Sequence, residues 1–238
     1  MLAIALLGVL EAADPPGQTA FLKAGNADPR DRFGAALAVS GDLLVVGAPG
    51  EGSRATGVNG DSVDDSLFAA GAVYVFTRSG DAWIQEAYLK ASDTHQRDEF
   101  GAAVAFSGDT LVVGAPGWST NGNGVASGPG AAYVFVRRDG AWVQQAMLQA
   151  ANAGQSDEFG AAVAVDGDTV VIGARSEDGG AVGVNGDGSD NGIPQAGAAY
   201  VFVRGEGRWI QQAYLKASNN RRGPFGAGGE FGYSVAVY

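Results

Sequence analysis

Short apolar runs separated by glycine-containing links occupy most of the chain. Residues 43–46 form a continuous apolar run, and residues 72–76 form a run that ends in Tyr-Val-Phe. Runs of this length that are rich in β-branched and aromatic side chains are typical of β-strands. The link at residues 40–42 contains glycine and has the length of a hairpin turn. The pattern therefore predicts an all-β fold in which neighbouring strands pair as hairpins.

The runs recur in units of about 60 residues, and each unit contains the same four runs in the same order. The first run begins at Phe-Gly, the second ends in Gly-Ala-Pro or Gly-Ala-Arg, the third ends in Tyr-Val-Phe, and the fourth begins at a tryptophan. The Phe-Gly pairs begin at Phe33, Phe100, Phe159 and Phe231. The Gly-Ala motifs begin at Gly47, Gly114 and Gly173. Three complete units follow, at residues 33–91, 100–150 and 159–217.

Four-stranded units that repeat in sequence, with a small-residue first strand and a polar fourth strand, specify the blades of a β-propeller. A β-solenoid would have shorter repeats, and a β-sandwich would not repeat its sequence this faithfully. We therefore predict an incomplete β-propeller of four-stranded antiparallel blades. It has three full blades within residues 20–238, with partial units at residues 20–24 and 231–238.

The Phe-Gly and Gly-Ala-Pro motifs in four-stranded units resemble the FG-GAP repeat of the integrin α-subunit propeller and its bacterial relatives. The resemblance covers residues 21–238 and implies a secreted or cell-surface protein. Integrin repeats often carry an Asp-x-Asp-x-Asp-Gly calcium loop between the first and second strands. The corresponding link here, residues 40–42, is only Ser-Gly-Asp, so that calcium site is not carried over.

Both ends of the chain depart from a complete propeller. Residues 2–10 are apolar but too few to span a bilayer as a helix. The leader, residues 1–19, is therefore either a secretory signal or a buried N-terminal strand. Three full blades fall below the usual minimum of four, so we expect the natural chain to continue past Tyr238. The present chain should form an open arc that self-associates through its exposed blade faces.

The amino-acid composition excludes several kinds of functional site and partner, but it says little about the fold. The chain has no cysteine and a single histidine, His95, which excludes disulfides, a thiolate nucleophile and a multi-histidine metal site. A net charge of −11 repels phosphate backbones, so no nucleic-acid partner is expected. Lys90, at the end of a fourth strand, is interpreted as an outer-edge charge that discourages aggregation.

The long loops, which join the second and third strands of a unit, contain candidate calcium ligands. Units one and three share the string Gly-Val-Asn-Gly-Asp in these loops. The candidates are Asp61, Asp64 and Asp65 in unit one, and Asp187, Ser189, Asp190 and Asn191 in unit three. Oxygen side chains at alternate positions followed by glycine can converge on one Ca²⁺. The alternative is that they serve turn geometry and side-chain-to-backbone hydrogen bonds.

Two further features lie in loops. Trp118, in the long loop of unit two, falls outside the repeat pattern and is a candidate contact for a glycan or protein ligand. Acidic pairs precede Phe-Gly, as at Asp98 and Glu99. They either form a ring of carboxylates at the propeller mouth or accept hydrogen bonds from backbone amides at the start of the first strand.

Three functions fit these features. The first is an extracellular recognition or adhesion module that binds a protein or glycan through acidic loops, assisted by calcium. The second is a structural spacer in a larger surface protein. The third is a glycan hydrolase or lyase that uses two carboxylates. The chain has no nucleophile elbow, histidine cluster or cofactor motif, so we expect a non-enzymatic protein.

Overall fold

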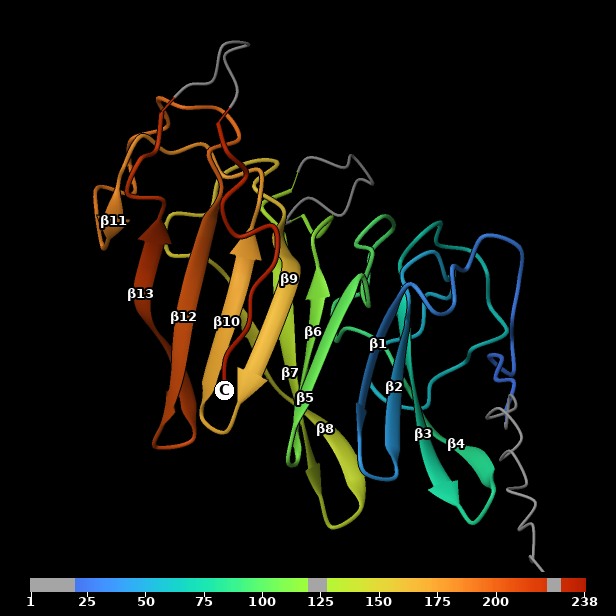
Figure 1. The fold of residues 1–238 in the computed structure, drawn as a ribbon. Coiled ribbons are helices and arrows are strands. Elements are labelled where there is room, and N and C mark those ends of the chain that lie inside the picture. The colour runs from blue at the N-terminus through green and yellow to red at the C-terminus, as the bar shows by residue number, and fades with distance from the viewer. Residues whose placement is uncertain (1–19, 120–127, 222–227) are drawn as a thin grey trace, which may run out of the picture.

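The protein folds into three antiparallel sheets that stand side by side in an arc (Figure 1). The computed structural model describes residues 20–119, 128–221 and 228–238. Every regular element among these residues is a strand, and they contain no helix that is long and apolar enough to cross a membrane. The predicted leader at residues 1–19 lies outside the described residues. The all-β, propeller-type fold is confirmed.

Each sheet is a meander in which the four strands of a unit lie in sequence order, with the first strand on the inner side. The first sheet consists of β1 (Ala36–Ser40), β2 (Leu43–Ala48), β3 (Ala72–Ser79) and β4 (Ala82–Leu89). The second consists of β5 (Ala103–Ser107), β6 (Thr110–Ala115), β7 (Ala131–Arg138) and β8 (Ala141–Leu148). The third consists of β9 (Phe159–Asp166), β10 (Thr169–Ala174), β12 (Ala198–Gly205) and β13 (Arg208–Lys216). It also has a two-residue outer strand, β11 (Gly183–Val184), which the sequence pattern did not predict.

Aromatic and aliphatic faces pack together at each boundary between sheets. At the first boundary, Val75 of β3 belongs to the same buried cluster as Tyr133 of β7. Within unit two, Phe100 meets the edge of Tyr133 with ring centroids 5.5 Å apart. Phe159 and Tyr200 repeat this contact at 5.3 Å in the third unit. Burial of these large apolar side chains is the main force that holds neighbouring sheets together.

The Phe-Gly and Gly-Ala motifs meet at these boundaries. A Cβ added to Gly114 would lie 1.9 Å from the carbonyl oxygen of Gly160 in the next unit. A Cβ added to Gly173 would lie 2.0 Å from the carbonyl oxygen of Gly232. No side chain fits in that space, so the close backbone approach requires glycine. This contact gives the physical reason why the two motifs recur in phase.

The two partial units match the repeat in sequence but form no strand. Phe231 docks on the third sheet through a parallel bridge to Gly197, as Phe100 docks on the first sheet. Residues 233–238 remain without a strand, because the described chain offers no second strand for them to pair with. Residues 20–24 are also irregular, although Ala24 is buried against the first sheet.

The outer face of the third sheet is less covered than the equivalent face of the first. Val45 and Leu89 of the first sheet are fully buried under the second sheet. Their counterparts in the third sheet, Val171 and Leu215, are only half-buried. The predicted self-association through open blade faces therefore keeps a physical basis, and it stays a prediction.

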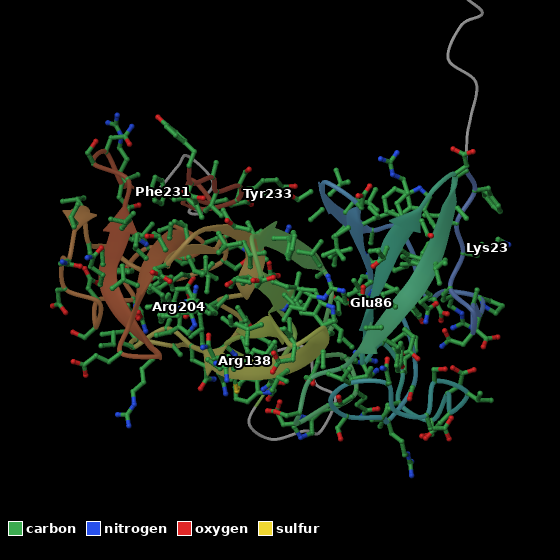
Figure 2. The ribbon with its side chains drawn as sticks, turned by 90° about the horizontal axis from the view of Figure 1, so that it is seen from below. Lys23, Glu86, Arg138, Arg204, Phe231 and Tyr233 are labelled. Carbon is green, nitrogen blue, oxygen red and sulfur yellow. The ribbon has the colours of Figure 1, made fainter. Side chains whose placement is uncertain are left out.

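The two ends of the sheets carry different connections. Short hairpins close the lower end in Figure 1, while the long loops and the connecting loops between units gather at the upper end. Figure 2 views the molecule from the hairpin end, where Arg138 and Arg204 lie on the second and third sheets. The predicted site residues therefore all lie at the loop end.

Candidate functional site

The loop end is built from the long loops of one unit and the connecting loops of the next. Four cavities lie there, with volumes of about 320, 190, 400 and 400 Å³. Four arginines line the cavities at the first two boundaries: Arg30, Arg32, Arg97 and Arg175. Five acidic residues of these loops are buried instead: Asp31, Glu51, Asp98, Asp157 and Glu177. The loop end therefore presents arginine side chains as well as acidic ones.

The acidic residues of the first long loop mostly bind their own loop. Asp61 accepts a hydrogen bond at Oδ1 from the amide of Val63 at 3.0 Å. Asp64 accepts one from the amide of Ser66 at 2.7 Å and pairs with Nε of Arg54 at 3.1 Å. These are the side-chain-to-backbone turns that favour Asp in loops.

The third long loop repeats this behaviour. Asp187 accepts hydrogen bonds at Oδ1 from both the amide and the hydroxyl of Ser189, at 2.9 and 2.6 Å. Asp190 accepts one from the amide of Gly192 at 2.8 Å. Hydrogen bonds to the ionised carboxylate hold the pKa of Asp187 below its ordinary value. Asn191 lies beside these turns and is exposed.

Asp65 is the one predicted ligand of the first loop that faces another acid. Partial desolvation and then the carboxylate of Asp28 raise the pKa of Asp65. Nowhere in residues 20–119, 128–221 and 228–238 do three or more acidic or histidine side chains gather as metal ligands. The residues of the two long loops thus fit turns better than a Ca²⁺ site. Calcium binding there is less favoured than the turn role, and it stays untested.

The shared Gly-Val-Asn string has a structural role that the sequence interpretation missed. Asn59 donates its amide to the carbonyl of Tyr88 at 2.7 Å, and its Oδ1 accepts the amide of Tyr88 at 2.9 Å. Asn185 and Tyr214 repeat both bonds at the same distances. Asn59 has a φ of 56°, a conformation that asparagine tolerates well. The string therefore covers the outer edge of the fourth strand, which would otherwise be open to pairing.

A buried ion pair lies beneath this edge. Nζ of Lys90 contacts Oε2 of Glu51 at 2.7 Å, with both side chains at most 1% exposed. The hydroxyl of Tyr88 donates to Oε1 of Glu51 at 2.8 Å. The third unit repeats the arrangement with Glu177, Tyr214 and Lys216. The interpretation of Lys90 as an exposed edge charge was wrong, because its partner lies 39 positions earlier in sequence.

Unit two replaces this network with a different one. Trp118 occupies the position of Glu51, four residues after the glycine of Gly-Ala-Pro, so it lies within the repeat pattern rather than outside it. Its side chain is only 6% exposed, and its Nε1 donates to Oδ2 of Asp93 at 2.9 Å. Met147 and Gln149 stand in the positions of the tyrosine and the lysine. The ring of Trp118 is closed to solvent, so the burial counts against its predicted ligand contact.

The aspartates that precede Phe-Gly are buried rather than arranged as a ring at the mouth. Asp98 accepts the amide of His95 at 2.7 Å, and Asp157 accepts the amide of Gly154 at 2.7 Å. Asp31 makes the same bond to Asp28 at 2.8 Å. Burial is the main cause that raises the pKa of Asp98 to about 7 and of Asp157 to about 6. These aspartates do accept backbone amides, but the amides belong to the connecting loop rather than to the start of the first strand.

Comparison with known proteins gives one clear match. A family model described as FG-GAP repeat matches residues 16–76, 83–135 and 142–202, which is more than half of the chain. No curated protein matches the chain. Each match ends in the third strand of a unit, and the second and third matches begin in the fourth strand of the preceding unit.

Proposed function

Because the chain belongs to the FG-GAP repeat family, we propose that it is an extracellular recognition module that binds a protein or a glycan through its loop end. The family supports the extracellular, adhesion-type setting. The loop end supports the binding role, because it carries open cavities lined by charged and aromatic side chains on a rigid scaffold.

The observation that carries the proposal is the lining of the cavity at the first boundary. This cavity of about 400 Å³ combines three arginines with an exposed phenylalanine, Phe68. Tryptophan, tyrosine and arginine dominate the energetics of protein interfaces, and exposed aromatic side chains in clefts mark contact sites. A cavity of this size lies in the range of ligand-binding pockets.

A structural spacer is the second candidate, and the half-buried outer face of the third sheet favours it. That face has the form of a surface that receives a further unit. The two candidates differ at the loop end, since a spacer needs no convergent site there.

A glycan-cleaving enzyme is less favoured by the geometry. Glu99 and Glu158 line the cavity at the second boundary. Glu158 is held in an ion pair with Arg175, and a carboxylate neutralised by arginine is a poor proton donor. Enzymatic activity itself stays untested.

Selection of ligands from a random peptide library and a glycan array would test the proposal. We expect bound ligands to lose affinity when the loop end is altered by Phe68→Ala, since the side chain is exposed and its removal leaves the fold intact. The matched control at the hairpin end is Asp109→Ala, which should leave binding unchanged. Absence of any ligand that distinguishes these two variants would refute the recognition role and favour the spacer.

A further inference from the structure

The cavity at the first boundary departs from the repeat in its charge. Its lining consists of Arg30, Arg32, Gly50, Phe68, Ala69, Arg97 and Glu99. We call it the arginine cavity. Three positive side chains gather there on a protein whose net charge is −11. Such a local reversal of charge indicates a partner group that is negative.

The walls of the arginine cavity are fixed by backbone hydrogen bonds between units. The amide of Arg97 donates to the carbonyl of Phe68 at 2.8 Å, and the amide of Glu99 donates to the carbonyl of Ala69 at 3.1 Å. Within unit one, the amide of Gly50 donates to the carbonyl of Asp31 at 2.9 Å. The long loop of unit one is thus tied to the connecting loop of unit two, so the cavity is formed before a ligand arrives.

The three arginines of the cavity form few ion pairs with acidic side chains of the protein itself. Arg30 forms no ion pair with any residue in the described part of the chain. The guanidinium of Arg97 lies over the ring of Phe68, 5.7 Å from its centroid. Arg32 reaches Glu99 only at 3.9 Å, with both side chains well exposed. An exposed pair at that distance contributes little, so the guanidinium groups remain available for a ligand.

Comparison of the units shows that this combination is specific to the first boundary. The residue before Phe-Gly is Arg32 in unit one, whereas the other units have Glu99, Glu158 and Glu230. The position of Arg30 and Arg97 is occupied by Ser156 in unit three. Phe68 corresponds to Pro194 in the third long loop. The architecture therefore does not require these side chains.

We propose that the arginine cavity binds a single carboxylate of a peptide segment, with an apolar neighbour of that carboxylate packed against Phe68. Arginine recognises a carboxylate through two parallel hydrogen bonds. The exposed ring of Phe68, 55% accessible, supplies apolar surface next to the charge. This inference rests on the proposed recognition function and specifies its ligand class.

The surroundings of the cavity favour a peptide over a polyanionic glycan. The adjoining cavity shares Arg30, Gly50 and Phe68 with the arginine cavity, but Asp28 and Asp65 also line it. A chain with a carboxylate on every sugar would bring negative charge against these acids, which is unfavourable. One carboxylate flanked by neutral residues avoids that repulsion.

The test uses the acetylated and amidated tetrapeptide Gly-Phe-Asp-Gly, its Asn analogue and trigalacturonate. Binding to the whole chain is followed by NMR shifts of the arginine Nε–Hε groups. We expect the Asp peptide to bind with a Kd of about 0.1–1 mM and to weaken with added salt. Arg32→Gln and Arg97→Gln should each weaken binding about tenfold. Arg138→Gln, at the hairpin end (Figure 2), is the matched control and should bind like the unaltered chain.

Three outcomes would overturn the proposal. The Asn peptide would bind as tightly as the Asp peptide, or the Arg32 and Arg97 variants would bind like the Arg138 variant, or trigalacturonate would bind more tightly than the peptide. A thermal melt of each variant confirms that it is folded. Ligands that depend on Phe68 but ignore the arginines would refute this inference and leave the recognition function standing.

Discussion

Removal of the buried lysine of unit one should destabilise the protein far more than the same change at the matched position of unit two. Lys90 is fully buried and contacts Glu51 at 2.7 Å. In Lys90→Met the glutamate stays buried without its cation, and breaking a buried pair in this way costs about 3–5 kcal/mol. Three donors to Oε1 remain: the hydroxyl of Tyr88 at 2.8 Å, the amide of Ser53 at 3.1 Å and Nδ2 of Asn26 at 3.5 Å. They place the expected loss near the lower limit, about 3 kcal/mol.

The second variant separates loss of charge balance from loss of packing. Replacing both partners, Glu51→Gln with Lys90→Met, removes both charges and keeps the side-chain volumes similar. Exchange of a whole buried pair for neutral side chains is often close to neutral. We therefore expect the double variant to recover most of the loss and to lie within about 1–2 kcal/mol of the unaltered chain.

Urea unfolding followed by tryptophan fluorescence measures these differences in the free energy of unfolding. The matched control is Gln149→Met, because Gln149 occupies the position of Lys90 in unit two and is exposed. Its expected effect is within about 0.5 kcal/mol. The reasoning is refuted if Lys90→Met costs no more than Gln149→Met, or if the double variant is less stable than Lys90→Met alone.

Three further predictions concern the loops and the boundaries. Millimolar Ca²⁺ should leave the Tm measured in EDTA unchanged; a rise that is lost in Asp61→Ala and Asp187→Ala would instead establish calcium sites in the long loops. Because folding raises the pKa of Asp98 to about 7, its contribution to stability is present at low pH and lost as the pH rises through about 7. Asp98→Asn should therefore reduce the fall in stability between pH 5 and 8 by up to roughly 2–3 kcal/mol in urea titrations, and an unchanged pH profile would contradict this. Gly114→Ala should destabilise the fold by about 1–3 kcal/mol, because its Cβ would lie 1.9 Å from a backbone carbonyl oxygen. Gly205→Ala, whose Cβ meets no atom within 4 Å, is the control in the same unfolding assay.

The strands were predictable because their signals are local. Apolar runs, hairpin glycines and the phase of Phe-Gly against Gly-Ala-Pro all lie within short stretches, and they gave the four main strands of every sheet. The outer strand β11 was not predictable from periodicity, because two residues carry no period. Its partner in β13 lies more than 30 residues further along the chain.

The buried polar networks could not be found from local pattern because burial depends on partners remote in sequence. Lys90 has the appearance of an exposed residue at the end of a strand, and only the approach of Glu51 explains its burial. A signal existed nonetheless. Glu51, Trp118 and Glu177 share one position relative to the Gly-Ala motif, and aligning the units there shows that Trp118 replaces a glutamate. The residue that bonds to this position changes in parallel: it is an asparagine in units one and three and Asp93 in unit two.

The side chain before Phe-Gly can change from one unit to the next without changing the fold. Arg32 has a φ of 59°, and Glu99 and Glu158 have values of 54° and 58° at the equivalent positions. The backbone there belongs to a turn common to the units, in which the carbonyls of Arg32, Glu99 and Glu158 each accept the amide three residues later at 3.0 Å. The side chain at this position projects from an unchanged frame, so an exchange of arginine for glutamate alters the charge of the adjoining cavity by two units. The repeat thus determines the position of the side chain before Phe-Gly. Substitution of that side chain decides whether the boundary attracts an anion or repels it.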